Sequence, residues 1–205
     1  MGKDESENRF STQRIETLID GIFAIAMTLL VFNIKLPERA EIADGAALSA
    51  SLAVLGPHFV AFGQSFLLLS LFWFVSHRQM RVIHHADVRF VWLNLFWLMA
   101  VVLVPFSTSL NGEYGRYQEG AAFFHGNLLL AGLLSCAIWH YADRKGLIHE
   151  SLTPAAIRTD KRRGLIFPLA ALLALAASLW SPGWSNLCYL LIPAALPLLG
   201  RRTEK

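Results

Sequence analysis

Apolar runs long enough to cross a lipid bilayer recur along the sequence. A membrane-spanning helix needs about 20 mostly apolar residues, because the hydrocarbon layer is about 30 Å thick and each residue advances the helix by about 1.5 Å. Six runs reach or approach this length, at about 15–36, 48–76, 90–110, 119–142, 164–181 and 184–200. Since 55% of the residues are hydrophobic and 16% are charged, we predict an all-α membrane protein in which residues 1–205 form a single six-span transmembrane domain.

Glycine and proline interrupt several of these runs. The turn Ser181-Pro182-Gly183 separates the last two, which are short, so we predict a tight hairpin of two spans there. Gly56-Pro57 lies in the second run and Pro105 in the third. We expect packing against neighbouring helices to accommodate both interruptions without ending the span.

Basic residues divide unequally between the two sides of the predicted membrane. The chain has 18 Lys and Arg residues and a net charge of +3. With both ends on one side, that side holds fifteen of these residues, and only Lys35, Arg39 and Arg116 fall on the other. Because positive loops stay in the cytoplasm, we expect both termini to be cytoplasmic. The run Lys161-Arg162-Arg163 follows the same rule, so we do not expect nucleic-acid binding.

The first predicted span has two chemically different stripes, because residues three and four apart share a face of a helix. One stripe holds Leu18, Gly21, Ile25, Thr28 or Leu29, and Phe32. The other holds Asp20, Phe23, Ala24, Met27 and Val31. The first stripe is apolar except for one hydroxyl, whereas the second carries a carboxylate near its cytoplasmic end.

A carboxylate within a span costs a few kcal/mol unless it is paired or wet, so Asp20 needs a partner. Arg14 precedes it on the same helix, His77 ends the second predicted span, and Asn94 lies at a similar depth in the third. Polar side chains in spans are tolerated when they bond across helices. We therefore predict a network of Arg14, Asp20, His77 and Asn94 that joins the first helix to its neighbours, with Asp20 as a structural group rather than a proton carrier.

Two blocks of this sequence resemble a known family. The first comprises Arg14, Asp20 to Ala26 and Thr28 to Leu30, and the second comprises His77, Asp87, Trp92, Asn94, Pro105-Phe106 and Thr108. Together they resemble the transmembrane protein 175 family of lysosomal potassium channels and their prokaryotic relatives, whose first-helix signature is an Arg, three residues, then Phe-Ser-Asp. Here Leu18 and Ile19 stand where the signature has Phe and Ser.

This resemblance implies a homotetramer in which the first helix of each subunit lines a central cation pore. It places a hydrophobic constriction at Ile25 and a hydroxyl layer at Thr28, and Leu29 and Phe32 share that stripe. It implies a potassium channel in a prokaryotic plasma membrane, with potassium and other monovalent cations, membrane lipids and further copies of the chain as partners and with no cofactor. Because an aliphatic ring cannot replace a hydration shell, we expect modest potassium-over-sodium selectivity.

Thr28 has a second interpretation, since threonine in a span often bonds the carbonyl four residues back. On the residues alone we would favour that backbone bond, whereas the resemblance favours an ion-facing hydroxyl. Two other functions also stay open. One is a small secondary transporter, proton-coupled through Asp20 or His77, and the other is a membrane scaffold that does not conduct.

The residue pattern gives little support for a metal-binding or catalytic site. His77, His84, His85 and Asp87 suggest a metal site, but Arg78, Arg81 and Arg89 surround them, and their charge opposes a cation. The sequence contains no Gly-x-Ser-x-Gly, glycine-rich phosphate loop or His-Glu-x-x-His motif, so we predict neither a catalytic nor a metal site. Cys136 and Cys188 both fall in predicted spans and indicate no disulfide framework.

Overall fold

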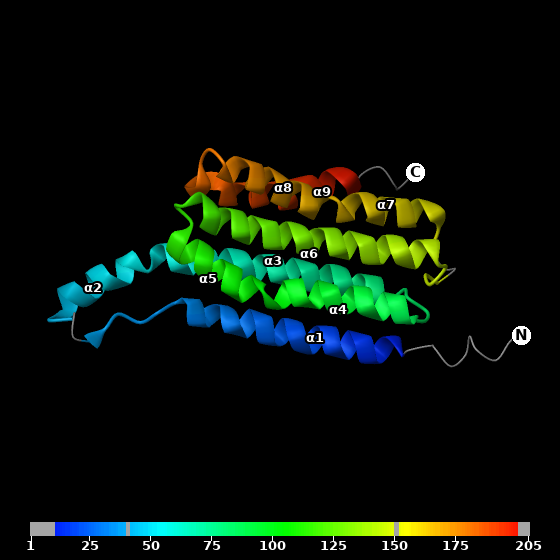
Figure 1. Cartoon of the computed structure of the whole chain (residues 1–205), viewed down its shortest axis with the longest axis horizontal. Helices are drawn as coiled ribbons and strands as arrows, with labels where there is room; N and C mark the ends of the chain where they lie inside the picture. The colour runs from blue at the N-terminus through cyan, green and yellow to red at the C-terminus, as the bar shows by residue number, and fades with distance from the viewer. Residues whose placement is uncertain (1–10, 40–41, 150–151, 201–205) are drawn as a thin grey trace, which may run out of the picture.

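The computed structural model of the chain describes residues 11–39, 42–149 and 152–200 and shows an elongated bundle of helices (Figure 1). In chain order, the helical elements of these residues are α1 (Thr12–Leu29), η1 (Leu30–Asn33), α2 (Gly45–Val54), α3 (Gly56–Met80), α4 (Val88–Val102), α5 (Val104–Tyr114), α6 (Gln118–Arg144), α7 (Pro154–Gly164), α8 (Ile166–Ser178), η3 (Pro182–Leu190) and α9 (Leu191–Gly200). An isolated antiparallel β-bridge joins Ile83 and Ile148. The predicted all-helical architecture is confirmed.

Within the part of the chain that the structure describes, four helical segments are long and apolar enough to cross a membrane. These are Thr12–Asn33, Gly56–Met80, Val88–Tyr114 and Gln118–Arg144. They fall on the first four predicted spans. The predicted fifth and sixth spans fall on α8 and on η3 with α9, which are shorter segments packed on one another, and their crossing of the membrane stays a prediction.

One predicted boundary is wrong. The run at 48–76 is not one helix, because α2 ends at Val54 and α3 begins at Gly56 with Pro57 in its first turn. Proline is favoured there because the first helical N–H groups have no partner within the helix. Figure 1 shows α2 extending beyond the bundle, so the spanning helix of this region is α3 alone. A similar break at Leu103, before Pro105, separates α4 from α5 without changing the direction of the chain.

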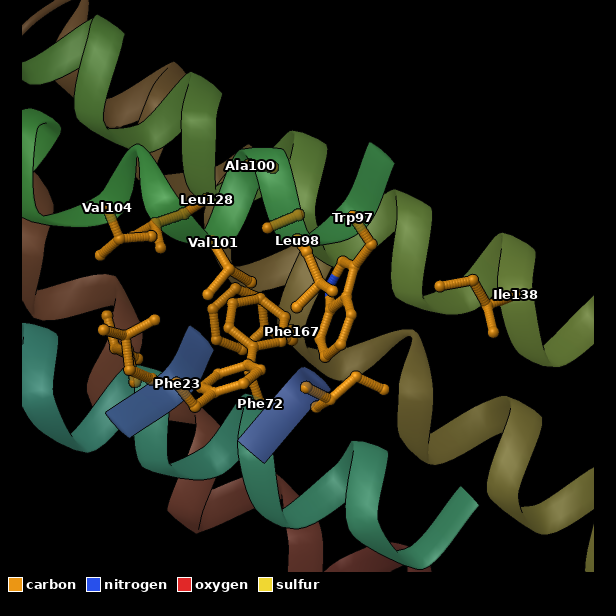
Figure 2. Packing of buried hydrophobic residues seen from close by; sticks show 14 of the residues in the cluster. Phe23, Phe72, Trp97, Leu98, Ala100, Val101, Val104, Leu128, Ile138 and Phe167 are labelled. Carbon is orange, nitrogen blue, oxygen red and sulfur yellow. The ribbon is translucent and has the colours of Figure 1, made fainter. Parts of the chain in front are cut away.

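Rings from four helices meet in the centre of the bundle (Figure 2). Phe23 of α1 lies 5.4 Å from Trp97 of α4, between ring centroids, and Trp97 lies 6.3 Å from Phe72 of α3. Phe72 then lies 4.0 Å from Phe167 of α8. Aromatic pairs at these separations add to the energy of burial, so this chain of rings links α1 to the far side of the subunit.

The described basic residues gather at one end of the bundle. Figure 1 shows the start of α1, the turn from α3 to α4, the end of α6 with the turn after it, and α7 at that end, while α9 runs back toward it. These segments carry Arg14, Arg78, Arg81, Arg89, Arg144, Lys145, Arg158, Lys161, Arg162 and Arg163. The segments that follow η1 and that join α5 to α6 lie at the opposite end, and they carry Lys35, Arg39 and Arg116. Lys3, Arg9, Arg201, Arg202 and Lys205 lie outside the described residues.

The buried side chain of His125 joins α6 to η3 through contacts with Ser185 and Tyr189. The Ser185 hydroxyl donates to the carbonyl oxygen of Pro182 at 2.6 Å. Because a hydroxyl has one hydrogen, its oxygen must accept the contact from His125 Nε2 at 2.7 Å. His125 Nδ1, 2.9 Å from the Tyr189 hydroxyl, therefore accepts from that O–H. The arrangement uses a neutral imidazole with the proton on Nε2 and satisfies every polar atom of the three side chains that it joins.

We expect His125→Leu to lower the free energy of unfolding by about 2 kcal/mol, because it leaves the buried Tyr189 hydroxyl without an acceptor. Thermal and denaturant unfolding of the detergent-solubilised protein measures this change. His140→Leu is the matched control, because His140 is exposed on the same helix and its loss should change little. An equal effect of both substitutions would contradict the assigned role of His125.

Candidate pore-lining site

The first helix attaches to the subunit along one stripe. Ile15, Ile19, Phe23, Ala26 and Leu30 recur every three or four residues and are all buried. They pack α1 and η1 against α3, α4 and α5. This spacing is that of a single helical face, so the opposite face of α1 is free of intrasubunit contacts over most of its length.

The four residues predicted to line the pore lie together on that free face. Ile25 is 60% exposed, Leu29 41% and Phe32 75%, and Thr28 is exposed between them. Leu18, 44% exposed, continues the same face toward the start of the helix. We name this surface, formed by Leu18, Gly21, Ile25, Thr28, Leu29 and Phe32, the open face of α1. In a membrane it must contact lipid, ions or another copy of the chain.

Thr28 donates its hydroxyl hydrogen within its own helix. Its Oγ1 lies 2.8 Å from the carbonyl oxygen of Ile25 and 3.0 Å from that of Ala24. The backbone bond considered from the sequence is therefore present. A hydroxyl oxygen also has two lone pairs, so the Thr28 oxygen remains an acceptor on an exposed position of the open face.

The structure corrects the predicted network of Arg14, Asp20, His77 and Asn94. Within residues 11–39, 42–149 and 152–200, no hydrogen bond or ion pair joins two of these four side chains. Arg14 is exposed, and buried Asn94 donates to the carbonyl oxygen of Phe90 in its own helix at 2.8 Å. The amide N–H of Asn94 is therefore engaged within α4.

Two parallel contacts between α1 and α3 replace that network. The indole Nε1–H of Trp73 donates to Asp20 Oδ1 at 2.8 Å. Glu16 Oε1 lies 3.2 Å from His77 Nδ1, an ion-pair distance without hydrogen-bond alignment. The Trp73 and His77 rings are stacked, with centroids 5.7 Å apart. Asp20 and Glu16 lie one turn apart on α1, as do Trp73 and His77 on α3. Because the two helices are antiparallel, Asp20 faces Trp73 and Glu16 faces His77.

Polar contacts also hold the carboxyl-terminal end of α1. Beyond the open face, Asn33 Nδ2 donates to the carbonyl oxygen of Pro105 at 3.0 Å, and Lys35 Nζ lies 3.5 Å from Glu113 Oε1. The sequence pattern predicts a role for neither Asn33 nor Trp73. Each is a polar group on a helix face that otherwise packs apolar residues. The sequence does not identify its hydrogen-bond partner, because that depends on the position of the neighbouring helix.

Asp87 has a structural role at the start of α4. Its Oδ1 accepts from the Phe90 backbone N–H at 2.7 Å, and its Oδ2 accepts from the Tyr141 hydroxyl at 2.6 Å. The first contact is a helix N-cap and the second joins α4 to α6. Both carboxylate oxygens of the residue considered for a metal site with His77, His84 and His85 are therefore engaged by protein donors.

Comparison with known proteins relates the first half of the chain to a defined family. The family model described as "Endosomal/lysosomal potassium channel TMEM175" matches residues 14–105. A protein of Chamaesiphon minutus named as a potassium channel is 35% identical over 141 residues, 67% of this chain and 69% of that protein. A potassium channel of Streptomyces collinus is 33% identical over 159 residues, 74% of this chain and 75% of that protein.

The resemblance extends to an animal protein and to solved structures. The human protein named "Endosomal/lysosomal proton channel TMEM175" is 28% identical over 210 residues, 92% of this chain but 41% of the human protein. The crystal structure of a lysosomal potassium-selective channel TMEM175 homolog from Chamaesiphon minutus superposes with a TM-score of 0.77 at 30% identity. That similarity covers 92% of this chain and 97% of the solved chain.

We expect Trp73→Phe and Asp20→Asn to be coupled. Trp73→Phe removes the indole donor, and Asp20→Asn removes the charge that strengthens the bond, so the second change should cost less once the first is made. A double-mutant cycle on the free energy of unfolding should give a coupling energy of about 1 kcal/mol. Trp92→Phe is the control, since Trp92 is 56% exposed, and it should be additive with Asp20→Asn. Additivity of the Trp73 pair as well would contradict the assigned contact.

Proposed function

The chain belongs to the TMEM175 family, and we propose that it forms a homotetrameric potassium channel in which α1 of each subunit lines a central pore. The observation that carries this proposal is the open face of α1, an exposed apolar surface with one hydroxyl on a helix otherwise fixed to its subunit. The names of the bacterial relatives, potassium channels from Chamaesiphon and Streptomyces, support the choice of ion.

Symmetry explains how one helix can form a pore. A single α1 cannot enclose a channel, but four copies related by a closed rotation present the same stripe to a common axis. The stripe that each copy would present is already free of intrasubunit packing. The aromatic contact of Phe23 with Trp97 on the opposite side fixes the rotation of the helix about its own axis.

Ile25 forms the narrowest ring of the proposed pore. It is the most exposed aliphatic side chain in α1, and an aliphatic ring can close a pore by excluding water. Leu29 and Phe32 extend the wall toward the outer end. The ring has no oxygen to replace ion hydration, so the barrier at Ile25 depends on its width and on whether water fills it.

Thr28 supplies the polar layer one turn outward from Ile25. Its hydrogen is engaged within the helix, so its oxygen is presented to the pore as an acceptor, which is the ligand type that monovalent cations prefer. One hydroxyl per subunit is a sparse coordination shell compared with a filter of successive carbonyl rings. We therefore propose a modest preference for potassium over sodium.

The unequal charge of the two ends suggests the orientation. The end that holds the start of α1 and the loops after α3 and α6 carries most of the described basic residues. Positively charged loops stay on the cytoplasmic side. We propose that this end faces the cytoplasm of a bacterium and that the chain resides in the plasma membrane, where lipids surround the tetramer.

Reconstitution of the purified protein in vesicles tests the function directly. Potassium efflux at channel rates, faster than sodium efflux, is the expected result. Saturable flux that requires a pH gradient would instead indicate a proton-coupled transporter, and the first residue to examine would then be Asp20. Absence of any ion flux, with correct reconstitution shown by vesicle flotation, would indicate a scaffold.

We expect Ile25→Asn to raise potassium efflux about tenfold or more, which corresponds to a barrier lower by about 1.4 kcal/mol. The amide holds water at the constriction and removes the cost of dewetting. Fluorescence-detected efflux from vesicles compares the variant with wild type at equal protein-to-lipid ratio. Leu172→Asn makes the same change at an exposed position on α8 and should leave efflux unchanged. Equal efflux from all three proteins would exclude Ile25 as the constriction.

We expect Thr28→Val to reduce the ratio of potassium to sodium permeability severalfold, because it removes the oxygen layer while keeping the side-chain shape. Reversal potentials under bi-ionic conditions give this ratio. Thr159→Val is the matched control, since Thr159 makes the same bond to the carbonyl four residues back on α7, outside the proposed pore. An unchanged ratio in Thr28→Val would show that selectivity arises elsewhere.

A further inference from the structure

A small cavity lies inside the subunit, away from the open face of α1. It lies between α3, α4 and α6, and its lining includes Ser76, Asn94, Trp97, Ser135 and Trp139. The space available to the centre of a water molecule is about 10 Å³. A cavity of roughly this size holds one water molecule when two to four polar groups surround it.

Two tryptophans that line this cavity each carry a hydrogen-bond donor without a protein acceptor. Trp97 is 1% exposed and Trp139 is 3% exposed. The Nε1–H of each is buried, and neither finds a hydrogen-bond partner in the described ranges 11–39, 42–149 and 152–200. A buried donor without an acceptor costs about 1–3 kcal/mol, and such donors are rare in native proteins.

The same cavity offers acceptors whose own hydrogens are already engaged. Asn94 Nδ2 donates to the carbonyl oxygen of Phe90, so its Oδ1 is available. The Ser76 hydroxyl donates to the carbonyl oxygen of Trp73 at 2.9 Å, which leaves its oxygen lone pairs available. Ser135 adds a further hydroxyl that can accept or donate.

We propose that this cavity is a binding site for one ordered water molecule, which accepts from the indole N–H groups of Trp97 and Trp139 and donates to Asn94 and a serine hydroxyl. Water is the ligand that matches this lining, because it has two lone pairs and two hydrogens in tetrahedral arrangement. A halide would need donors on all sides and would face the Asn94 and serine oxygens. A metal cation would face two N–H groups and find no carboxylate among the lining residues.

The position of the site connects the water molecule to the packing of helices α4, α6 and α1. Trp97 belongs to α4 and Trp139 to α6, so a water molecule between them joins the two helices. The Trp97 ring also contacts Phe23 of α1. A bonded water molecule would therefore hold the indole against which the first helix packs.

An isosteric substitution tests the site, because the presence and the absence of the water molecule predict opposite changes in the thermal midpoint. Replacing Trp139 by β-(3-benzothienyl)alanine keeps the ring size and removes only the N–H group. If a water molecule accepts from this group, the thermal midpoint of the purified, full-length protein should fall by several degrees. If the N–H group is instead unpaired, its removal should raise the midpoint, and that result would overturn the proposal. The same replacement at Trp180, which is 82% exposed, should leave the midpoint unchanged.

Two direct measurements complete the test. An experimental density map that resolves ordered solvent should contain a peak within hydrogen-bond distance of both Nε1 atoms. The ultraviolet resonance Raman difference between wild type and Trp97→Phe should place the indole N–H of Trp97 in the hydrogen-bonded range. A map without that peak, or with the two indoles bonded to Asn94 and Ser135 directly, would refute the site even if the substituted proteins failed to fold.

Discussion

The packing of Phe23 against Trp97 determines how the first helix faces its surroundings. Phe23 lies at the centre of the buried stripe of α1, and its ring is 5.4 Å from Trp97 between centroids. Trp97 is in turn supported by Phe72, which contacts Phe167 across the subunit. A helix rotates its residues by about 100° per position. A shift of the buried stripe by one residue would therefore turn the open face toward α3 or α4, so the composition of any pore built from α1 depends on this aromatic contact.

Polar side chains in the spanning helices are used mainly in pairs between helices. Trp73 donates to Asp20, Asn33 donates to the carbonyl oxygen of Pro105, and Thr108 donates to Ser65 Oγ at 2.8 Å or to its own backbone. Hydrocarbon offers no alternative partner, so each such group favours one arrangement of two helices. Two of these contacts hold the first helix, at Asp20 in α1 and at Asn33 in η1, while the open face carries only one polar side chain, Thr28. The polar chemistry thus fixes the helix and leaves its exposed face apolar.

Sequence periodicity predicted the parts of this arrangement that depend on a single helix. The i, i+3, i+4 spacing separates Ile25, Thr28 and Phe32 from Phe23, although Ala24 and Val31, which it groups with Phe23, are exposed. The apolar runs place the first four spans. Contacts between helices were harder to predict, because they depend on relative height and rotation. The partner of Asp20 is Trp73, one turn before the expected His77. An indole N–H within an aromatic-rich run has no distinguishing pattern until α3 is placed antiparallel to α1.

The two interpretations of Thr28 are compatible when the direction of its hydroxyl hydrogen is taken into account. A hydroxyl has one hydrogen and two lone pairs, and the structure directs the hydrogen toward the carbonyl oxygens of Ala24 and Ile25. That bond limits the rotation of the side chain, so the oxygen stays an acceptor instead of turning its hydrogen outward toward a cation. A hydroxyl that was free to rotate would have to break its contact with water or a neighbour each time an ion passed. The backbone bond that first argued against an ion-facing role is therefore compatible with the role proposed for Thr28, and in the proposed tetramer it would act in the same way in each copy of α1.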